Sequence, residues 1–278
     1  MKVRPRRGRI SSAEHFHHGL PGAGLLFWPC VKLRLLSYNI HRAIGVDRRF
    51  RPDRVASIIS YYHPDVVMLQ EVDEGVPRSR ERDLGRDLAE TLGYEHYAIG
   101  HNVTLRKGRY GNATLSRWPI LRERNIDLTV EIRKRRGCQH TRIDVRPSHG
   151  KRRRLEIFNM HLGLSARERE KQLGILVRSR EFRALPYDVA CVVGGDFNDW
   201  RSLLHPIFVE LLGFRSATGS GARRDGPIQT FPSFFPQGAL DRLYFRGPMR
   251  LAGVRRCRLA LSRIASDHLP VIVDFQLN

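Results

Sequence analysis

The chain has 278 residues, enough for one large α/β domain or two small ones with a substantial buried core. Hydrophobic residues make up 41% of it, which excludes a disordered chain, and no run of 18 apolar residues is present that could span a membrane. The formal net charge of +21 is carried almost entirely by arginine, and it favours nucleic acid or an anionic lipid surface as partner, unless it reflects only a GC-rich genome.

Residues 1–31 are expected to form a basic, disordered arm before a folded domain at residues 32–278. The stretch MKVRPRRGRI is strongly basic, and GLPGAGLLFWPC at residues 19–30 is short and mostly apolar, an order that resembles a signal peptide in outline. Polar residues separate the two stretches, and prolines interrupt the second. A disordered basic arm, or a start of the sequence that is too early, is therefore an alternative to export or anchoring at a membrane interface.

The four cysteines are widely scattered and form no CxxC pair, which argues against a structural zinc site and a disulfide framework. A cytoplasmic location is therefore expected, with peripheral membrane association and export as alternatives.

The first part of the domain alternates predicted strands and helices. KLRLLSYNI at residues 32–40 is an apolar stretch that ends in polar residues, as a strand entering a loop does. Helical spacing of apolar residues predicts a helix over residues 51–64, and a second helix is predicted over residues 83–93, closed by Gly93. Between them, VVMLQEVD at residues 66–73 is too short for a helix and predicts a strand.

The remainder consists mainly of successive predicted strands, over residues 95–99, 112–116, 140–145, 155–160, 187–195, 239–245 and 269–277. A long charged helix is predicted over residues 166–182. The mixture of strand–helix alternation and successive strands indicates a layered α/β domain with a mixed sheet.

The densest charge lies in residues 131–154, EIRKRRGCQHTRIDVRPSHGKRRR, with ten basic and two acidic side chains. One interpretation is a solvated hairpin and loop, and the other is a rim that faces a phosphate group. Few aromatic residues accompany these charges, so base stacking of the single-strand type is not supported there.

Residues that can bind a metal or move a proton recur where predicted strands end. They are Asn39 and His41 in SYNIH, Glu71 and Asp73 in LQEVD, His161 in NMHLG, Asp196 and Asn198 in GGDFND, Asp241 in ALDR, and Asp267 and His268 in SDHLP. Each alone can be an ordinary turn or cap residue, but so many desolvated charges are costly unless they are compensated. Carboxylates and amides with few cysteine or histidine ligands favour a hard cation, Mg²⁺ or Mn²⁺.

The ordered motifs SYNIH, LQEVD, GNATLSRWPI, NMHLG, GGDFND, LDRLYF and SDHLP resemble the endonuclease/exonuclease/phosphatase superfamily, also described as deoxyribonuclease I-like. The resemblance covers residues 32–278, and GGDFND and SDHLP are its most specific elements. It implies a four-layered α/β sandwich, in which two mixed β-sheets pack face to face with helices outside. It also implies an active site at one end of the sandwich.

By the same resemblance, the chain is a divalent-metal-dependent phosphoester hydrolase with Mg²⁺ as cofactor and Mn²⁺ as an alternative. Glu71 would be the main metal ligand, with Asn39 close to it and Asp267 near the metal. Asn112 would belong to a hydrogen-bond network on the substrate side. A cation suits this chemistry because a phosphodiester is anionic and repels nucleophiles.

The resemblance implies catalytic roles for five further residues. Asp196 would help to bind the metal or orient the attacking water, and Asn198 would hold a non-bridging phosphate oxygen. His268, oriented by Asp241, would act as general base or stabilise the transition state. His161 would contact the phosphate or assist the leaving group.

Departures from the family pattern bear on the substrate. His161 stands where abasic-site endonucleases carry a tyrosine followed by Pro-Asn, which resembles the nuclease, sphingomyelinase and inositol-phosphatase branches. RGCQHTRI, HLGLSARERE and TFPSFFPQGALDRLYFRG resemble a compact bacterial subgroup whose relatives include proteins of lipid and GPI-anchor remodelling.

Three functions are therefore compatible with the sequence. The first is a phosphodiesterase or nuclease acting on nucleic acid, and the second is the same chemistry on a phospholipid headgroup or small phosphoester at an anionic membrane surface. The third is a non-catalytic module that binds polyanions. A monomer is expected in each case.

Overall fold

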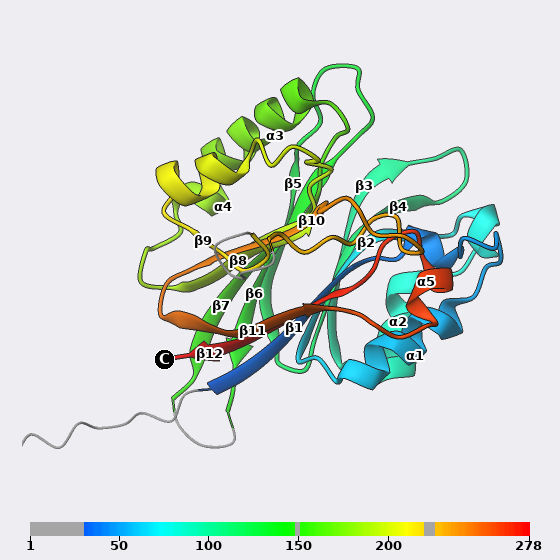
Figure 1. The fold of residues 1–278 in the computed structure, drawn as a ribbon, viewed down its shortest axis with the longest axis horizontal. Coiled ribbons are helices and arrows are strands. Elements are labelled where there is room, and N and C mark those ends of the chain that lie inside the picture. Colours follow the sequence, from blue (N-terminus) through cyan, green and yellow to red (C-terminus); the bar gives the residue numbers. More distant parts are fainter. Residues whose placement is uncertain (1–30, 148–150, 220–225) are drawn as a thin grey trace, which may run out of the picture.

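The computed structural model describes residues 31–147, 151–219 and 226–278, which form two six-stranded β-sheets packed face to face (Figure 1). Helices cover the outer face of each sheet. The expected four-layered α/β sandwich with two mixed sheets is confirmed. The predicted arm lies outside the described residues except for Val31, where the first strand begins. Within the described ranges no helix has the length and apolar character needed to cross a membrane.

The first sheet has the strand order β11-β12-β1-β2-β4-β3. These strands are β11 (Met249–Arg256), β12 (Val271–Leu277), β1 (Val31–Asn39), β2 (Val66–Glu74), β4 (Arg109–Ser116) and β3 (His96–Thr104). β1 and β2 are parallel, and the other neighbours are antiparallel. The helices of this half are η1 (His41–Ala43), α1 (Pro52–Tyr62), η2 (Pro77–Ser79), α2 (Leu84–Leu92) and α5 (Ser262–Ala265).

The second sheet has the order β5-β6-β7-β8-β10-β9. Its strands are β5 (Ile120–Asp127), β6 (Gly137–Val145), β7 (Arg153–His161), β8 (Ala190–Asp196), β10 (Asp241–Arg246) and β9 (Arg215–Ser216). β7 and β8 are the parallel pair here. The helices of this half are α3 (Ala166–Arg178), α4 (Arg180–Arg183) and the π-helical turn η3 (Ile207–Leu211).

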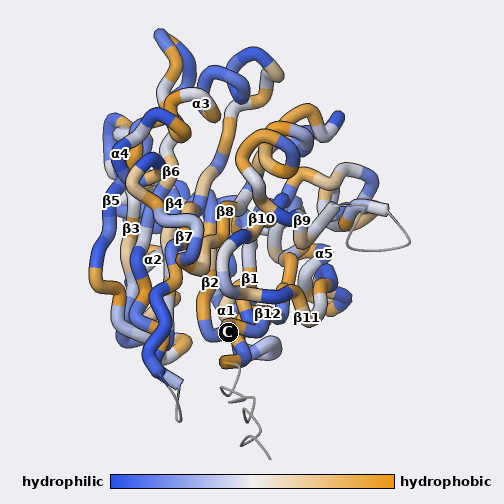
Figure 2. Tube along the Cα trace, turned by 90° about the vertical axis from the view of Figure 1, so that its left-hand side faces the viewer, coloured by the Kyte–Doolittle hydropathy of each residue, from blue (hydrophilic) through white to orange (hydrophobic). Residues whose placement is uncertain are grey.

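Three buried hydrophobic clusters correspond to the three interfaces between the layers. Ile58 of α1 belongs to the cluster on the outer face of the first sheet. Leu35 and Ile157 meet between the two sheets, and Leu173 of α3 packs with Val193 on the outer face of the second. A strand inside a sheet that is covered by other layers is buried on both faces. This explains why the inner strands β2 and β8 are mainly hydrophobic while the edge strand β5 is mainly hydrophilic (Figure 2).

The structure corrects the predicted helix over residues 166–182, which is broken at Ser179 into α3 and α4. Ser179 is extended (φ −62°, ψ 148°), and its side-chain oxygen accepts a hydrogen bond from the backbone N–H of Phe182 at 3.3 Å. This serine therefore caps a new helix instead of continuing the old one. The edge strands β5 and β11 are additional to the predicted elements.

The topology brings the predicted strand ends to one end of the sandwich. Asn39 lies opposite Gln70 in the parallel pair of the first sheet. In the second sheet the register aligns His161, Asp196 and Asp241 on three neighbouring strands. Asn39 Nδ2 donates a hydrogen bond to Asp196 Oδ2 at 3.0 Å, which joins the two sheets at this end.

Candidate active site

Asp196, the last residue of β8, lies at the centre of the predicted site and is 2% exposed. Its Oδ1 accepts a hydrogen bond from the backbone N–H of Asn198 at 3.0 Å, and its Oδ2 accepts the one from Asn39. The Nε2 atoms of His161 and His268 lie 3.5 and 3.6 Å from the same Oδ2. Four other predicted site residues therefore surround one carboxylate.

Steric constraints explain why a glycine and an asparagine flank Asp196 at positions 195 and 198. Gly195 has φ 128°, and a Cβ atom there would lie 2.0 Å from the carbonyl oxygen of Met160 on the neighbouring strand. Asn198 has φ 50°, in the left-handed region that asparagine tolerates better than most residues. Its Nδ2 donates to the carbonyl oxygen of Leu162 at 3.0 Å. The glycine and the asparagine thus let the chain turn while both polar side chains stay at the end of β8.

His268 and Asp241 form a buried pair. Nδ1 of His268 lies 2.9 Å from Asp241 Oδ2 and donates to it, because a carboxylate can only accept. The same oxygen accepts a hydrogen bond from the Thr230 hydroxyl at 2.5 Å. The ring of Phe231 lies 5.0 Å from the imidazole ring. These contacts fix the tautomer and orientation of His268, with Nε2 on the side of Asp196.

The charges in this group depend on one another. Burial opposes a charge on His268, but Asp241 and Asp196 raise the pKa of its imidazole to about 10. Burial raises the pKa of Asp196 to about 6 against the opposing effect of His268. Burial, and then Arg136 and other cations, lower the pKa of His161 well below its ordinary value. At neutral pH the group therefore holds an imidazolium, a carboxylate and a neutral imidazole.

Glu71 lies near the end of β2, where the strand has a bulge between Leu69 and Val72 and Glu71 has φ 58°. Its Oε2 atom is buried, has no hydrogen-bond partner and lies 3.3 Å from Arg42 Nε. Buried carboxylate oxygens are normally hydrogen-bonded, so this exception calls for an explanation. A bound cation is one, since a hard metal ion binds carboxylate oxygen.

The donor set fits such a cation. Asn39 and Asp267 add an amide and a carboxylate oxygen, although the amide oxygen of Asn39 already accepts a hydrogen bond from the backbone N–H of His41 at 3.0 Å. Across the described ranges, no group of three or more His, Cys, Asp or Glu side chains could hold a metal by itself. Mg²⁺ commonly uses one or two carboxylates together with water and substrate oxygens, so it does not require such a group.

Asn112 is buried between the sheets beneath these residues. Its Nδ2 donates to the backbone carbonyl oxygens of Gly137 and Asn159 in the second sheet, at 3.2 and 3.0 Å. Asn159 in turn donates to two carbonyl oxygens of the first sheet and accepts from Gln70 Nε2 at 2.8 Å. Asn159 and Gln70 were not predicted, although their polar side chains inside apolar strands were a usable signal. This layer holds the two halves of the site together.

Arg136 begins the stretch RGCQHTRI but is not among the predicted site residues. It directly precedes β6 and is 6% exposed. Within the described residues it has no ion pair or side-chain hydrogen bond, and its Nε is buried without a partner. It comes last in a run of four basic residues, and nothing in their chemistry distinguishes the buried one from the exposed ones.

The basic cluster at residues 131–154 is divided between two ends of the second sheet. Arg136 lies at the site end of β6, whereas the connection from β6 to β7 lies at the opposite end. Arg142 and Arg154 donate to the buried Glu156 at 2.8 and 2.5 Å. Of the described residues of this cluster, Arg136 in the first part therefore lies at the same end of the sheet as Asp196.

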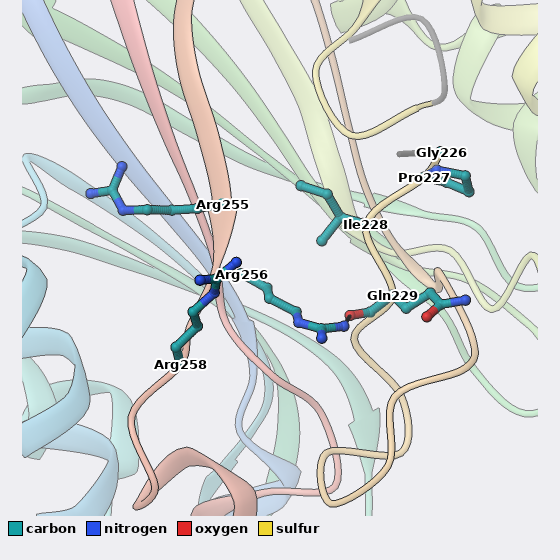
Figure 3. A pocket seen from close by; sticks show the side chains of 7 residues that line it. All are labelled: Gly226, Pro227, Ile228, Gln229, Arg255, Arg256 and Arg258. Carbon is teal, nitrogen blue, oxygen red and sulfur yellow. Dashed lines mark hydrogen bonds between the residues drawn. The ribbon is translucent and has the colours of Figure 1, made fainter. Parts of the chain in front are cut away.

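Another arginine group lines a pocket of about 280 Å³ beside β11, opposite residues 226–229 (Figure 3). Arg255 pairs with Asp274 at 2.7 Å, and Arg256 donates to the Gln229 carbonyl oxygen at 3.0 Å. These two side chains thus have partners within the protein. Arg256 lies opposite Val271 at the start of β12, so the pocket adds positive charge at this edge of the first sheet.

The sequence also matches the family model described as "Endonuclease/Exonuclease/phosphatase family" over residues 36–268. The chain belongs to the endonuclease/exonuclease/phosphatase family. Members of this family are typically phosphoester hydrolases and are generally metal-dependent. The resemblance drawn from the ordered motifs is therefore confirmed at the level of the family.

One relative within the family is the uncharacterized protein YbhP of Escherichia coli (strain K12), 32% identical over 256 residues that cover 88% of this chain and 96% of YbhP. A solved endonuclease/exonuclease/phosphatase from Beutenbergia cavernae DSM 12333 has a TM-score of 0.72 at 22% identity, covering 89% of this chain and 72% of that one. The human Nocturnin catalytic domain with bound sulfate has a TM-score of 0.69 at 20% identity, covering 89% and 94%. These two structures show the shared fold.

Proposed function

We propose that the protein hydrolyses phosphoesters by attack of water on phosphorus beside Asp196 and His268. The observation that carries this proposal is the buried group itself, in which an imidazole held by Asp241 lies next to a second carboxylate of raised pKa. A module that only binds polyanions has no use for two buried carboxylates, since they repel phosphate. A hydrolase needs a proton acceptor and a fixed cation there.

Each residue of the site has a separate role in this mechanism. Asp196 accepts a proton from the attacking water, because a pKa of about 6 leaves it ionised at neutral pH and still basic. His268, as an imidazolium, donates from Nε2 to a non-bridging phosphoryl oxygen and offsets the charge that develops there. Asn198 binds another non-bridging oxygen, and His161 assists the leaving group. The water oxygen forms a bond to phosphorus as the ester P–O bond breaks, and the ester oxygen leaves with that electron pair and takes a proton from solvent.

Glu71, Asn39 and Asp267 would hold Mg²⁺ or Mn²⁺. The ion, when bound, supplies Lewis-acid stabilisation of negative charge on the phosphoryl oxygens. The Oε2 atom of Glu71, which is buried and has no hydrogen bond, supports its role as the main ligand.

Hydrolysis of bis(p-nitrophenyl) phosphate by the purified protein with Mg²⁺ or Mn²⁺ tests this proposal. His268→Ala is expected to lower turnover by about 10²- to 10⁴-fold while the fold is retained. His96→Ala, on β3, is the matched control and should leave turnover unchanged. Equal activity of wild type and His268→Ala would refute the proposal.

Nucleic acid is the first candidate substrate, supported by the net charge of +21. A phospholipid is the second, supported by exposed aromatic side chains near the site. Phe231, which contacts His268, lies 5.7 Å from the ring of Trp200, and Trp200 is 56% exposed. In the segment that follows, Phe234 and Phe235 are 64% and 63% exposed. Aromatic side chains of this kind partition into a membrane interface.

Supercoiled plasmid, single-stranded oligonucleotide and phospholipid vesicles, offered separately, distinguish the two substrates. Salt-sensitive nicking of DNA would support the first candidate, because phosphate contacts release counterions. Hydrolysis of vesicle lipid that is weakened by Phe234→Ser and Phe235→Ser, with bis(p-nitrophenyl) phosphate turnover unchanged, would support the second.

A further inference from the structure

Arg136 is 6% exposed, and its Nε is buried without a hydrogen-bond partner. Among the described residues, no carboxylate forms an ion pair with this largely buried guanidinium. Other buried arginines of the chain do have partners, such as Arg169, whose Nη2 lies 3.3 Å from Asp199. An unpaired buried charge is destabilising, which makes a functional reason for this arginine worth testing.

The backbone around Arg136 places this charge at the candidate active site. β6 begins at the next residue, Gly137, and in the antiparallel register with β7 Cys138 lies opposite Met160, the residue before His161. His161 in turn lies opposite Asp196. Arg136 thus lies at the end of the second sheet where His161 and Asp196 lie.

The position is also held firmly. The carbonyl oxygen of Arg136 accepts from the backbone N–H of Leu128 at 2.9 Å, and its own N–H donates to the Thr129 hydroxyl at 3.4 Å. A Cβ atom on Gly137 would lie 2.0 Å from Asn102 Oδ1, so the chain can approach β3 this closely only at a glycine. The guanidinium therefore projects from a fixed base, which lowers the entropy cost of binding an anion.

The surroundings of Arg136 favour an anion. His161 is neutral, and the positive charges of Arg136, Lys134 and Arg42 all act on its pKa in the same direction. Arg42 has Glu71 as a partner, whereas Lys134 pairs with no carboxylate among the described residues and lies over the ring of Tyr110. An oxyanion bound here would compensate charges that the protein leaves uncompensated.

We propose that Arg136 binds the phosphoryl group of the substrate, with its guanidinium donating to non-bridging oxygens of the phosphate held between His161 and Asn198. This inference rests on the proposed phosphoester hydrolysis and adds a substrate-binding residue to it. A guanidinium suits the role because its planar fork donates two parallel hydrogen bonds to phosphate and stays charged at any working pH. No proton or covalent bond is transferred by this residue.

Binding of inorganic phosphate in the presence of EDTA, followed by calorimetry, tests the inference without any turnover. Wild type should bind phosphate, and Arg136→Gln should weaken the affinity by about 10- to 100-fold, the loss expected for charged hydrogen bonds. Arg136→Lys, which keeps the charge and loses the fork, should fall between them. Arg135→Gln is the matched control, because it removes the same charge from an exposed neighbour, and its affinity should stay within about twofold of wild type.

Thermal unfolding separates binding from structure. Arg136→Gln should leave the melting temperature unchanged or raise it, because it removes an unpaired buried charge. A fall of more than about 4 °C would show a structural role and overturn the inference. Unchanged phosphate affinity in Arg136→Gln, an equal loss in Arg135→Gln, or no binding by wild type would overturn it too. Turnover that survives His268→Ala would instead refute the proposed function and leave the phosphate site standing.

Discussion

Replacing Asp241 by asparagine separates two roles of His268, as a cation and as a shaped hydrogen-bonding group. The wild-type carboxylate lies 2.9 Å from Nδ1 and is the first of the groups that raise the pKa of the imidazole. Asparagine has nearly the same shape and can still accept from Nδ1 or from the hydroxyl of Thr230, but it carries no charge. The variant should therefore fold while its imidazolium loses its main stabilising partner.

The size of the effect follows from the pKa of His268. A value of about 10 against an ordinary 6.5 corresponds to roughly 5 kcal/mol in favour of the imidazolium. Asp196 and Asp267 contribute to this stabilisation together with Asp241. Removing one of the three carboxylates should therefore lower the pKa of His268 by at least about one unit. Turnover should then begin to fall at a lower pH, and it should be at least about twofold below wild type at pH 9 and about tenfold below it at pH 11, because the fraction of imidazolium falls by these factors.

The assay is the pH–rate profile of wild type and Asp241→Asn with a chromogenic phosphodiester, between pH 5 and 11. Wild-type activity should rise as Asp196 loses its proton near pH 6 and fall as His268 loses its proton near pH 10. Asp188→Asn, at an exposed position, is the control and should reproduce the wild-type profile. An alkaline limb that stays in place in Asp241→Asn, with unchanged turnover at pH 9, would refute the reasoning.

Three further predictions concern the metal, acid stability and the layer between the sheets. Glu71→Gln should abolish Mg²⁺-dependent turnover and weaken Mg²⁺ binding at least about tenfold in calorimetry, and an unchanged affinity would contradict its role as ligand. Burial alone would raise the pKa of Glu156, but hydrogen bonds from His140 and Arg154 lower it to about 2 from 4.5. As pH falls, the unfolded chain therefore binds a proton at Glu156 before the folded protein does. The stability that ionised Glu156 provides is present above about pH 4.5 and is lost as pH falls towards 2. Urea unfolding should show this loss, and Glu156→Gln should abolish it. Asn159→Ala should cost about 2–4 kcal/mol in the same assay, because carbonyl oxygens of the first sheet lose their donor, and a cost below about 1 kcal/mol would contradict this.

The sequence alone determined the elements whose signals are local. The helix α2 carries its own capping residue, Asp83, which accepts from the backbone N–H of Arg86, and its own stop at Gly93, with φ 69°. β8 is a short apolar run that ends in a glycine-led turn, and Asp196 and Asn198 follow from that turn. Motifs of this kind give both the family and most of the candidate site, because the residues within each motif are neighbours in the chain.

Tertiary structure decided everything that depends on which distant segments become neighbours. β5 and β11 are charged sequences that become strands because a central strand satisfies their backbone hydrogen bonds on one side. In the sequence, Asp196, Asp241 and His268 are no closer than 27 residues apart. Only the register of the second sheet and the loop before β12 place the two carboxylates beside the imidazole. Arg136 is chemically identical to Arg135, and its burial follows from the pairing of β6 with its neighbours. Burial and charge compensation are properties of the assembled sheets, so no local pattern in the sequence could reveal them.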